Sequence, residues 1–539
     1  MSVTISAGVR LLVLTAAVAV ALTPAGGAAR AGTQAPLIGG PYARLLAHSA
    51  DLGAARDGDV QLVVALRDST RPRGLIGWAD IHGLSVRWQP GQDWAIVEGA
   101  AHAVADAFGV AVHDYRSADG HMFYAAARQP DVPVPMRTEV TEVGRILGYG
   151  RNRVAKPPTF PLDVPKPGLT PAVVMTAYDA TPLAATGKGQ TIAFFEFGDY
   201  DTADLQAYAT RFTLPAFNMA PPVGGMPPHN DSSGETTMDL EAAHAVAPDA
   251  RLVVVNANTY VSAENFQWSQ IGNMFDAVDR RYPGAVWSSS ISTGPCDWLL
   301  ARVDAQPARS ALATAESHGT SALDAAGDTA GLECKEDLAG HWGAKPTPDD
   351  IGLDPVASLP EMTDVGGTTL STDANGVWVS EETWVDYAMQ QGTGGGVSAV
   401  FDRPAYQRSL LVPEDSQLGK HRLTPDVAAV ADALTGIMVR FNNNWVVMGG
   451  TSIAAPLWAG FAALMNQYLL ANGGHVLGEL NPLLYRAASG ARQPAFHDVT
   501  LGGNAVYTAR PGYDLVTGLG TPDINNLARN ILDIQKAGR

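Results

Sequence analysis

The stretch Thr191-Ile192-Ala193-Phe194-Phe195 decides the fold, together with the segment TADLQAYATRF that follows it at residues 202–212. The first is a nearly uninterrupted apolar run, typical of a strand buried on both faces, and the second has the residue spacing of a helix. This order predicts an α/β domain whose mostly parallel sheet is covered by helices, with ligands bound beyond the carboxyl ends of the strands. The alternation continues, with further strands predicted at residues 251–255, 285–291 and 320–326 and helices at residues 235–246, 261–282 and 301–318.

The N-terminus has the pattern of a signal peptide, which we place at residues 1–31. Arg10 precedes an apolar run over residues 11–22, and Ala29-Arg30-Ala31 fits a small-residue cleavage site. The apolar run is too short to span a bilayer, and no later run of that kind approaches membrane length. We therefore expect a secreted, extracellular protein with no membrane partner.

Two further segments precede the main α/β region at residues 169–539. Residues 32–153 mix strand-like and helix-like runs and are long enough for a smaller α/β domain. Residues 154–168 are rich in proline, which cannot continue a helix or a central strand, and predict a linker. A foldable domain in this place would suit a removable propeptide, although an ordinary N-terminal domain has the same pattern.

Composition narrows the classes of partner and site. The 539 residues include 54 acidic and 36 basic side chains, a formal net charge of −18. Nucleic acids and anionic membranes require a basic footprint, so we expect neither as a partner. Cys296 and Cys334 are the two cysteines, too few for a disulfide-dense scaffold or a four-cysteine zinc site. They could form one disulfide in an oxidising compartment or remain two separate thiols.

A candidate nucleophile lies in Gly449-Gly450-Thr451-Ser452, between a strand-like run at residues 445–448 and an apolar helix at residues 457–469. The glycines permit a tight turn that holds the Ser452 hydroxyl clear of the backbone. A helix start also supplies free N–H groups where an oxyanion could form. Taken alone, a serine in this position is more often a helix N-cap.

Candidate carboxyls occur in two places. Glu235 and Asp239 are four residues apart on a predicted helix, so they share one face and one of them tends to keep a proton. Glu241 points off that face, and we expect it to be a solvated charge near the helix start. An apolar strand stops at Asp328, which places that carboxyl at the edge where parallel sheets bind ligands. Asp324 lies inside the strand and is expected to be structural.

These motifs together resemble the sedolisin family, the kumamolisin-like serine-carboxyl peptidases. The resemblance rests on Gly-Glu-x-x-x-Asp, then Ala-Gly-Asp, then Gly-Gly-Thr-Ser-x-x-x-Pro, in that order, and spans residues 169–522. Residues 108–125 are similar to the activation propeptide of the family. Further matching motifs are found at residues 365–370, 394–398 and 425–428.

The resemblance implies a subtilisin-like catalytic domain in which a glutamate replaces the catalytic histidine. Ser452 would attack a peptide carbonyl and Glu235 would take and return its proton. Asp239 would orient Glu235, and a protonated Asp328 would donate a hydrogen bond to the oxyanion. Glu196 matches a position that extends the chain of carboxyls in some members. Its alternative is a strand-end carboxyl with structural hydrogen bonds.

The resemblance also implies a biological setting. We expect a self-processing precursor whose own propeptide is an intramolecular inhibitor, a monomer that cleaves protein or peptide substrates as an endopeptidase. Tripeptidyl-peptidase action remains open. Because Asp328 must be neutral and the base partly ionised, we expect activity only in acid, with Glu235 close to an ordinary carboxyl pKa.

Substrate and metal sites follow from the same resemblance. An extended substrate would pair with two backbone walls, Ser292-Thr293-Gly294 and the glycines around Gly395. Some members have an aromatic residue where Thr293 stands. One structural Ca²⁺ is expected, because hard cations need several oxygen ligands. The alternative is an Asp-rich turn without metal. The implied ligands are the carboxylates of Asp498 and Asp514 and the carbonyls of Val499, Arg510 and Gly512, although the family usually has glycine at position 510.

Three other hypotheses account for parts of the sequence. His318-Gly319-Thr320 has the tripeptide of true subtilisins and could belong to an Asp-His-Ser triad, but His318 is expected to end a helix that Gly319 caps. A non-catalytic binding protein on a peptidase fold is a second reading, and the complete catalytic set argues against it. A metallo-hydrolase is the third, but the sequence has no His-Glu-x-x-His motif.

Overall fold

The structure is a computed structural model, and it describes most of residues 35–538. The exceptions are residues 57, 119, 151–158, 162–167, 263–265, 291–295, 336–346, 388, 414–419 and 491–492, and the side chains of residues 159–161. The predicted signal peptide, most of the predicted linker and the predicted substrate wall Ser292-Thr293-Gly294 therefore lie outside the described residues.

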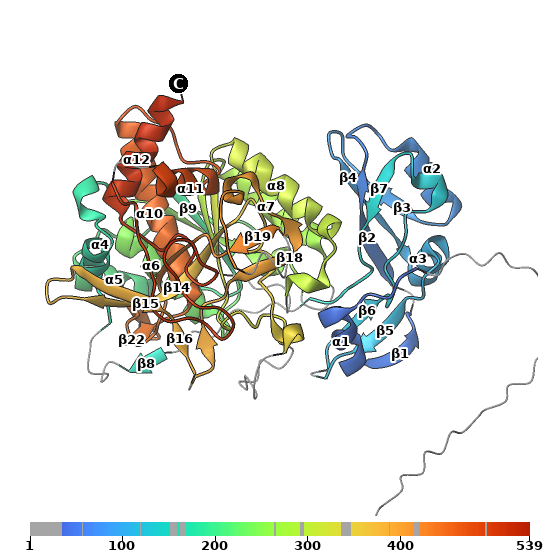
Figure 1. Ribbon diagram of the computed structural model, residues 1–539, viewed down its shortest axis with the longest axis horizontal. Coiled ribbons are helices and arrows are strands. Elements are labelled where there is room, and N and C mark those ends of the chain that lie inside the picture. The colour runs from blue at the N-terminus through green and yellow to red at the C-terminus, as the bar shows by residue number, and fades with distance from the viewer. Residues whose placement is uncertain are drawn as a thin grey trace, which may run out of the picture.

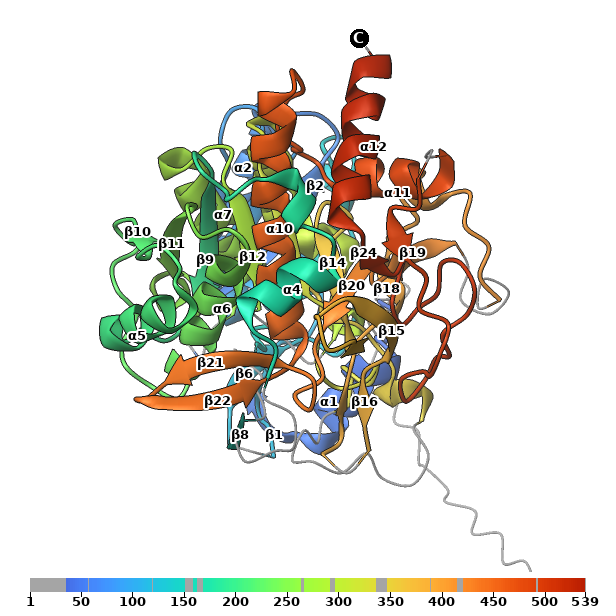
Figure 2. The ribbon, with the colours of Figure 1, turned by 90° about the vertical axis from the view of Figure 1, so that its left-hand side faces the viewer.

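A mostly parallel sheet forms the centre of the larger lobe (Figures 1 and 2). All neighbouring strands run parallel except β14 and β15, which are antiparallel. This confirms the predicted sheet. In spatial order its strands are β10 (Asn218–Met219), β11 (Arg251–Asn256), β9 (Thr191–Glu196), β12 (Val286–Ser289), β13 (Ser321–Ala325), β14 (Thr363–Thr372) and β15 (Trp378–Thr383), and β20 (Val427–Val430) also pairs with β14.

Helices cover both faces of this sheet, because alternate residues of its strands point to opposite sides. Ile192 and Phe194 of β9 pack into a core with α6 (Ser233–Val246) and α10 (Thr451–Ala471). Ala193 and Phe195 pack instead with α7 (Trp268–Arg281) and α8 (Gln306–Ser317). Burying each phenylalanine side chain completely adds about 1.5–3 kcal/mol to the free energy of unfolding. The first core also contains residues of α4 (Pro171–Ala177), α5 (Thr202–Phe212), α11 (Asn481–Gly490) and α12 (Ile524–Ala537).

The central helix α10 begins earlier than the sequence predicted. Its apolar run suggested a start at Leu457, but the helix begins at Thr451 and therefore contains Ser452 in its first turn. Among the described residues it is the one helix long and apolar enough to cross a membrane. Its most apolar window is 83% buried inside the protein, as expected for a core helix.

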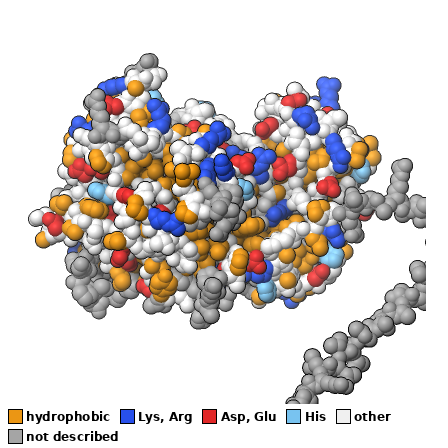
Figure 3. Space-filling view, viewed as in Figure 1, with side chains coloured by type: hydrophobic (Ala, Val, Ile, Leu, Met, Phe, Trp, Pro, Cys, Tyr) orange, Lys and Arg blue, Asp and Glu red, His pale blue; other side chains and the backbone are white. Residues whose placement is uncertain are grey.

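Residues upstream of the linker form a smaller lobe with its own core (Figures 1 and 3). One antiparallel sheet packs against helices α2 (Arg73–Ile81) and α3 (Ala101–Phe108), and a three-stranded sheet lies beside α1 (Gly40–His48). Figure 3 shows this lobe set off from the larger one by a notch. The strands of the two sheets are β3 (Ser85–Arg87), β4 (Trp94–Ala100), β2 (Asp59–Leu66) and β7 (Val140–Val143), then β1 (Ala50–Ala54), β5 (His113–Arg116) and β6 (Met122–Ala125).

Two arginines of the smaller lobe bind the larger one. The Arg44 guanidinium forms an ion pair with Asp350 at 2.8 Å and donates to the carbonyl oxygen of Cys334 at 2.7 Å. The backbone N–H of Arg145 donates to the Asp304 carboxylate at 3.0 Å. Asp304 is buried in this contact, and its burial raises the pKa of the carboxyl to about 7.

Part of the predicted linker is ordered as a strand. Residues Thr159–Pro161 form β8, which pairs antiparallel with β22 (Asn444–Met448), itself paired with β21 (Ile437–Phe441). The strand lies at an edge of this small sheet, where proline is tolerated because one side needs no N–H donor. The chain upstream of the larger lobe thus contacts the strand that leads to Ser452.

The two cysteines form a disulfide, which resolves the alternative left open by the sequence. Cys296 precedes a short 3-10 turn at Asp297–Leu299, and Cys334 lies in the loop that follows Asp328. The bond therefore joins the segment after the predicted substrate wall to the segment after Asp328.

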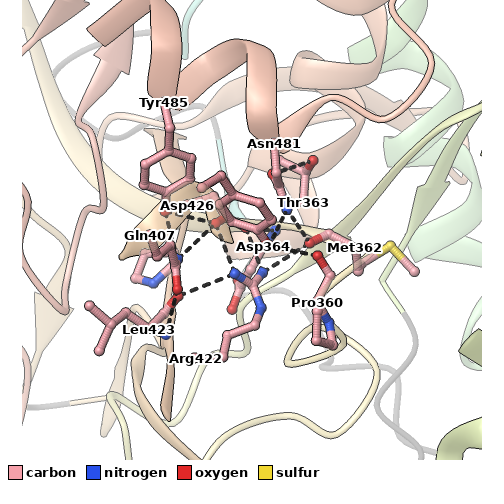
Figure 4. A network of polar contacts seen from close by, with 12 residues as sticks. Pro360, Met362, Thr363, Asp364, Gln407, Arg422, Leu423, Asp426, Asn481 and Tyr485 are labelled. Carbon is pink, nitrogen blue, oxygen red and sulfur yellow. Dashed lines mark hydrogen bonds and ion pairs between the residues drawn. The ribbon is translucent and has the colours of Figure 1, made fainter. Parts of the chain in front are cut away.

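A buried ion pair lies beside the amino ends of β14 and β20 (Figure 4). The Arg422 guanidinium lies 2.6 Å from the Asp426 carboxylate, and neither side chain is exposed. The Tyr485 hydroxyl donates to Asp426 at 2.8 Å, and the Asp364 backbone N–H donates to it at 2.9 Å. These donors satisfy a charge that would otherwise be costly to bury.

Asp324 and Asp364 lie side by side in register on the parallel strands β13 and β14. Both are buried, and each has one carboxylate oxygen with no hydrogen-bond partner in the described part of the chain. Burial raises the pKa of both well above the usual value. The charges of Asp354 and Asp426 add to the shift, and Arg422 opposes it at Asp364. The folded protein therefore favours neutral carboxyls at these two positions.

We predict that this pair makes folding stability fall as pH rises. A raised pKa in the folded state stabilises the fold fully below the unfolded value, about 3.9, and that contribution is lost as pH rises through the folded value. Denaturant titrations of the whole chain at pH 4 to 8 should show a decreasing free energy of unfolding. Asp324→Asn should flatten that slope and Asp533→Asn, at an exposed position, should not. An unfolding free energy that rises with pH would contradict the prediction.

Candidate active site

Ser452 lies at the carboxyl edge of the central sheet, where β22 turns into α10. Its side chain is buried, and the free backbone N–H groups of the helix start lie beside it. Gly450 has φ +111°, a conformation that residues with a Cβ rarely adopt. A Cβ at this position would lie 2.8 Å from Oδ2 of Asp328. The turn therefore needs glycine both for its backbone and for the close approach of that carboxyl.

Glu235 and Asp239 lie one turn apart on α6, and both are 1% exposed. Burial raises the pKa of Glu235 well above its ordinary value. The Ser452 hydroxyl lowers this pKa, and the carboxyls of Glu196 and Asp328 raise it. The structure thus brings these groups together. Neither oxygen of Glu235 accepts a hydrogen bond of normal geometry from a described residue, so this carboxyl can accept a proton.

Asp239 continues the set toward Glu196, the last residue of β9. The Ser290 hydroxyl donates to Asp239 at 3.2 Å, and the Thr236 hydroxyl donates to Glu196 at 3.0 Å. Oδ1 of Asp239 and Oε1 of Glu196 have no donor in the described chain, and the charge of Glu196 raises the pKa of Asp239. Burial raises the pKa of Asp239 and raises that of Glu196 to about 8. A proton shared between them would satisfy both oxygens.

Asp328 follows β13 and faces the site from the other side of the Ser452 turn. Its Oδ1 accepts two hydrogen bonds from Thr451, one from the backbone N–H and one from the hydroxyl, each at 2.8 Å. Its Oδ2 has no partner among the residues that the structure describes. Burial raises the pKa of Asp328, and the two bonds from Thr451 lower it. A neutral Asp328 would have a proton to donate.

The site therefore combines three chemical elements. A serine hydroxyl lies beside a buried carboxyl on α6, and a second buried carboxyl, that of Asp328, is hydrogen-bonded to the residue before the serine. These are the requirements for acyl transfer through a serine nucleophile.

Comparison with known proteins identifies the family. No protein-family model matches the chain. Kumamolisin from Bacillus sp. (strain MN-32) is 30% identical over 480 residues, which cover 83% of this chain and 80% of that protein. The chain belongs to the sedolisin family.

Two more similarities agree with this assignment. Tripeptidyl-peptidase 1 from Mus musculus is 27% identical over 413 residues, covering 70% of this chain and 68% of that protein. A solved structure of Pseudomonas sedolisin, a serine-carboxyl proteinase, superposes with a TM-score of 0.56 and 24% identity, covering 68% of this chain and 98% of that one. The latter supports the fold alone. As a member of the sedolisin family, the chain is a serine-type peptidase that acts on proteins or peptides.

One of the two predicted substrate walls of this sedolisin can be described. Gly395 has φ +133°, and a Cβ there would lie 2.4 Å from the carbonyl oxygen of Leu515. The neighbouring Gly394 N–H donates to the carbonyl oxygen of Gly327 at 2.8 Å, which fixes this wall next to Asp328. The other wall, Ser292-Thr293-Gly294, lies outside the described residues.

The five residues expected to bind calcium surround one turn. Oδ2 of Asp498 accepts from the N–H of Gly512 at 2.8 Å, and Oδ2 of Asp514 accepts from the N–H of Arg510 at 2.9 Å. Asp514 is buried and burial raises its pKa. No described group of three or more His, Cys, Asp or Glu side chains could hold a metal. The donors here would instead be two carboxylates and three carbonyls, including that of Val499, and oxygens of this kind suit Ca²⁺.

His318 is excluded from the sedolisin site by its position. It ends α8 as predicted, Gly319 follows with φ +97°, and its Nδ1 lies 2.9 Å from the Asp279 carboxylate. The residue precedes β13, whereas Asp328 follows the same strand. It therefore lies at the amino edge of the sheet, opposite Ser452, and the Asp-His-Ser alternative is wrong.

Two expectations about carboxyls were also wrong. Glu241 is not solvated: it is fully buried, and its carboxylate accepts from the backbone N–H of Arg440 at 2.8 Å. This follows because α6 is enclosed between α10 and β21. Glu235 does not keep an ordinary pKa, because its burial removes the water that would stabilise its charge.

The sequence reasoning missed three hydroxyls that contact the carboxyls. Thr236, Ser290 and Thr451 each donate to one of them. One signal was available. The predicted strand at residues 285–291 contains consecutive serines in an otherwise apolar run, and buried hydroxyls need hydrogen-bond partners.

Proposed function

We propose that the chain is a secreted, acid-active serine-carboxyl endopeptidase that is made as a self-processing precursor. The observation that carries this proposal is the convergence of Ser452, Glu235 and Asp328 on one buried site. Because the ionisable groups around this serine are carboxyls, both the base and the oxyanion donor are assigned to carboxyl groups. The sedolisin family membership supports the same reading.

Each residue has a defined role in the proposed reaction. Glu235 removes the Ser452 proton as the hydroxyl oxygen bonds to the substrate carbonyl carbon. The negative oxygen that forms accepts hydrogen bonds from the neutral Asp328 and from the start of α10. Glu235 then gives the proton to the leaving amine as the peptide C–N bond breaks. Water hydrolyses the resulting ester by the same steps in reverse order.

Asp239 and Glu196 make Glu235 a workable base despite its raised pKa. Carboxyls in contact titrate as one group, so the set retains a negative charge that can reside on Glu235. Asp239 orients Glu235, and the proton between Asp239 and Glu196 limits repulsion within the set. The proposed mechanism requires this cluster to be partly ionised while Asp328 remains protonated, so activity should fall on both sides of a pH optimum.

The smaller lobe supports the proposal of a precursor. Contacts through Arg44 and Arg145 attach it to the larger lobe, and the linker strand β8 pairs with β22, the strand before Ser452; an intramolecular inhibitor needs attachment of this kind. The predicted leader at residues 1–31 would direct the precursor out of the cell, and the mature enzyme would be a monomer. The alternative of a permanent N-terminal domain differs in one respect, since that domain would stay attached after activation.

We predict that purified precursor incubated in acid will lose about 14–18 kDa of N-terminal mass, the size of a small folded domain, and then hydrolyse an N-terminally blocked peptide. Activity should follow a bell-shaped pH profile and be lost at pH 8, because rising pH removes the proton that Asp328 must donate. Mass spectrometry and a fluorogenic assay measure the two events. Cleavage only of substrates with a free N-terminus would indicate tripeptidyl-peptidase action instead.

Variants separate chemistry from folding in that experiment. Ser452→Ala should abolish both conversion and turnover, and Asp328→Ala should lower kcat by about 10²–10³-fold, the usual effect of removing an oxyanion donor. Asp533→Asn, at an exposed position, should match the unchanged protein. Full activity at pH 8, or turnover by Ser452→Ala, would contradict the proposed function.

Calcium is proposed as a structural ion at residues 498–514. Asp498 and Asp514 with the carbonyls of Val499, Arg510 and Gly512 would hold it. Because Tyr513, within this turn, donates to the carbonyl oxygen of Pro425 at 2.9 Å, the ion would steady the segment next to β20.

We predict that chelation of Ca²⁺ lowers the Tm of the protein and that added Ca²⁺ restores it. Binding to the folded state alone stabilises by about 2.7 kcal/mol when the free ion is at 100 times its Kd. Differential scanning fluorimetry with and without chelator measures the shift. Asp498→Asn should reduce the shift, whereas Asp373→Asn, in an exposed turn, should not. A Tm that does not change with Ca²⁺ would contradict the assignment.

A further inference from the structure

The hydrogen bonds around Asp328 distinguish its two carboxyl oxygens. Oδ1 accepts from the N–H and from the hydroxyl of Thr451, each at 2.8 Å, while Oδ2 has no partner among the described residues. The Thr451 hydroxyl itself accepts from the backbone N–H of Gly327 at 3.1 Å. Because that N–H occupies one side of the hydroxyl oxygen, the hydroxyl hydrogen is directed toward Oδ1.

This arrangement decides where a proton on Asp328 can lie. A proton on Oδ1 would face two hydrogens already pointing at that oxygen, one from nitrogen and one from oxygen. A proton on Oδ2 meets no such conflict. Oδ2 also lies over Gly450, 2.8 Å from the position that a Cβ would occupy there, on the approach to Ser452. The acid proton is therefore held on the oxygen that faces the nucleophile turn.

We propose that Thr451 is a positioning residue of the peptidase: its hydroxyl fixes the Asp328 proton on Oδ2 and aims it at the oxyanion. This inference rests on the proposed function and adds a role for a residue next to the nucleophile. Thr451 acts through Asp328 and does not contact the reacting atoms. A Cβ added at Gly367 on β14 would lie 3.3 Å from the Thr451 methyl group, so glycine at that position leaves room for the Thr451 side chain.

The role predicts a specific change in pH dependence. The Thr451 hydroxyl donates to Oδ1, which favours the ionised form of Asp328, so its removal should raise the pKa of that group. The descending limb of the kcat profile, which reports loss of the Asp328 proton, should then move to higher pH. A variant that only damaged the fold would lower activity at every pH and leave the limb in place.

The test compares Thr451→Val, which keeps the shape and removes the hydroxyl, with Thr451→Ser, which keeps the hydroxyl. Thr451→Val should lower kcat about 2–10-fold, the range for a hydrogen bond between neutral groups, and shift the limb upward. Thr451→Ser should remain close to the unchanged enzyme in both respects. A peptide aldehyde forms an oxyanion on the serine when it binds. The Thr451→Val variant should bind this inhibitor more weakly than the unchanged enzyme does, by a factor similar to the loss in kcat.

A control variant at another buried threonine tests whether the effect is specific to Thr451. Thr363→Val removes another buried hydroxyl, one that donates to Asn481 at 2.8 Å, and should leave the pH limb unchanged. The positioning role would be overturned if the descending limb of the kcat profile did not move in Thr451→Val. It would also be overturned if Thr451→Ser lost as much kcat as Thr451→Val. Failure of the proposed function is distinguishable, because in that case Ser452→Ala would still turn over substrate and no variant would respond to the aldehyde.

Discussion

The site buries four carboxyls, those of Glu235, Asp239, Glu196 and Asp328. Their mutual repulsion, with little water to screen it, limits which neighbours each carboxyl can have. Each can remain there only if it is neutral, shares a proton or accepts hydrogen bonds. The site uses all three solutions. Asp239 and Glu196 are placed to share a proton, Asp328 accepts two bonds on one oxygen, and burial favours the neutral form of Glu235. The chemistry of the site follows from this division.

The surrounding fold makes this arrangement geometrically possible. Glu196 and Asp328 come from strand ends of one parallel sheet, and α6 and α10 deliver Glu235 and Ser452 to the same edge. Gly450 lets the Asp328 carboxyl approach the helix start more closely than a larger residue would allow. Further carboxyls follow the same rule deeper in the sheet, where Asp426 is paired with Arg422 and Asp324 lies beside Asp364. Buried carboxyls whose neutral form is favoured are therefore found in the core as well as in the site.

The sequence predicted the sheet and its helices because buried parallel strands read as apolar runs. It also placed Glu235, Asp239, Asp328 and Ser452 together through motif order. What it could not supply were contacts between distant segments. The burial of Glu241 depends on the enclosure of α6, and the hydroxyl of Thr451 is informative only once Gly327 and Asp328 lie against it. The assignment of an ordinary pKa to Glu235 failed for the same reason, since burial is a property of the folded chain.

The state of Asp328 is the point on which the proposed mechanism depends most directly. Neutron diffraction from deuterium-exchanged crystals of the protein at acidic pH would locate hydrogen on its carboxyl group. The account predicts a deuteron on Oδ2 of Asp328, directed toward the space beside Ser452, and none on Oδ1. An ionised Asp328 under conditions where the enzyme is active, or a deuteron on Oδ1, would contradict it.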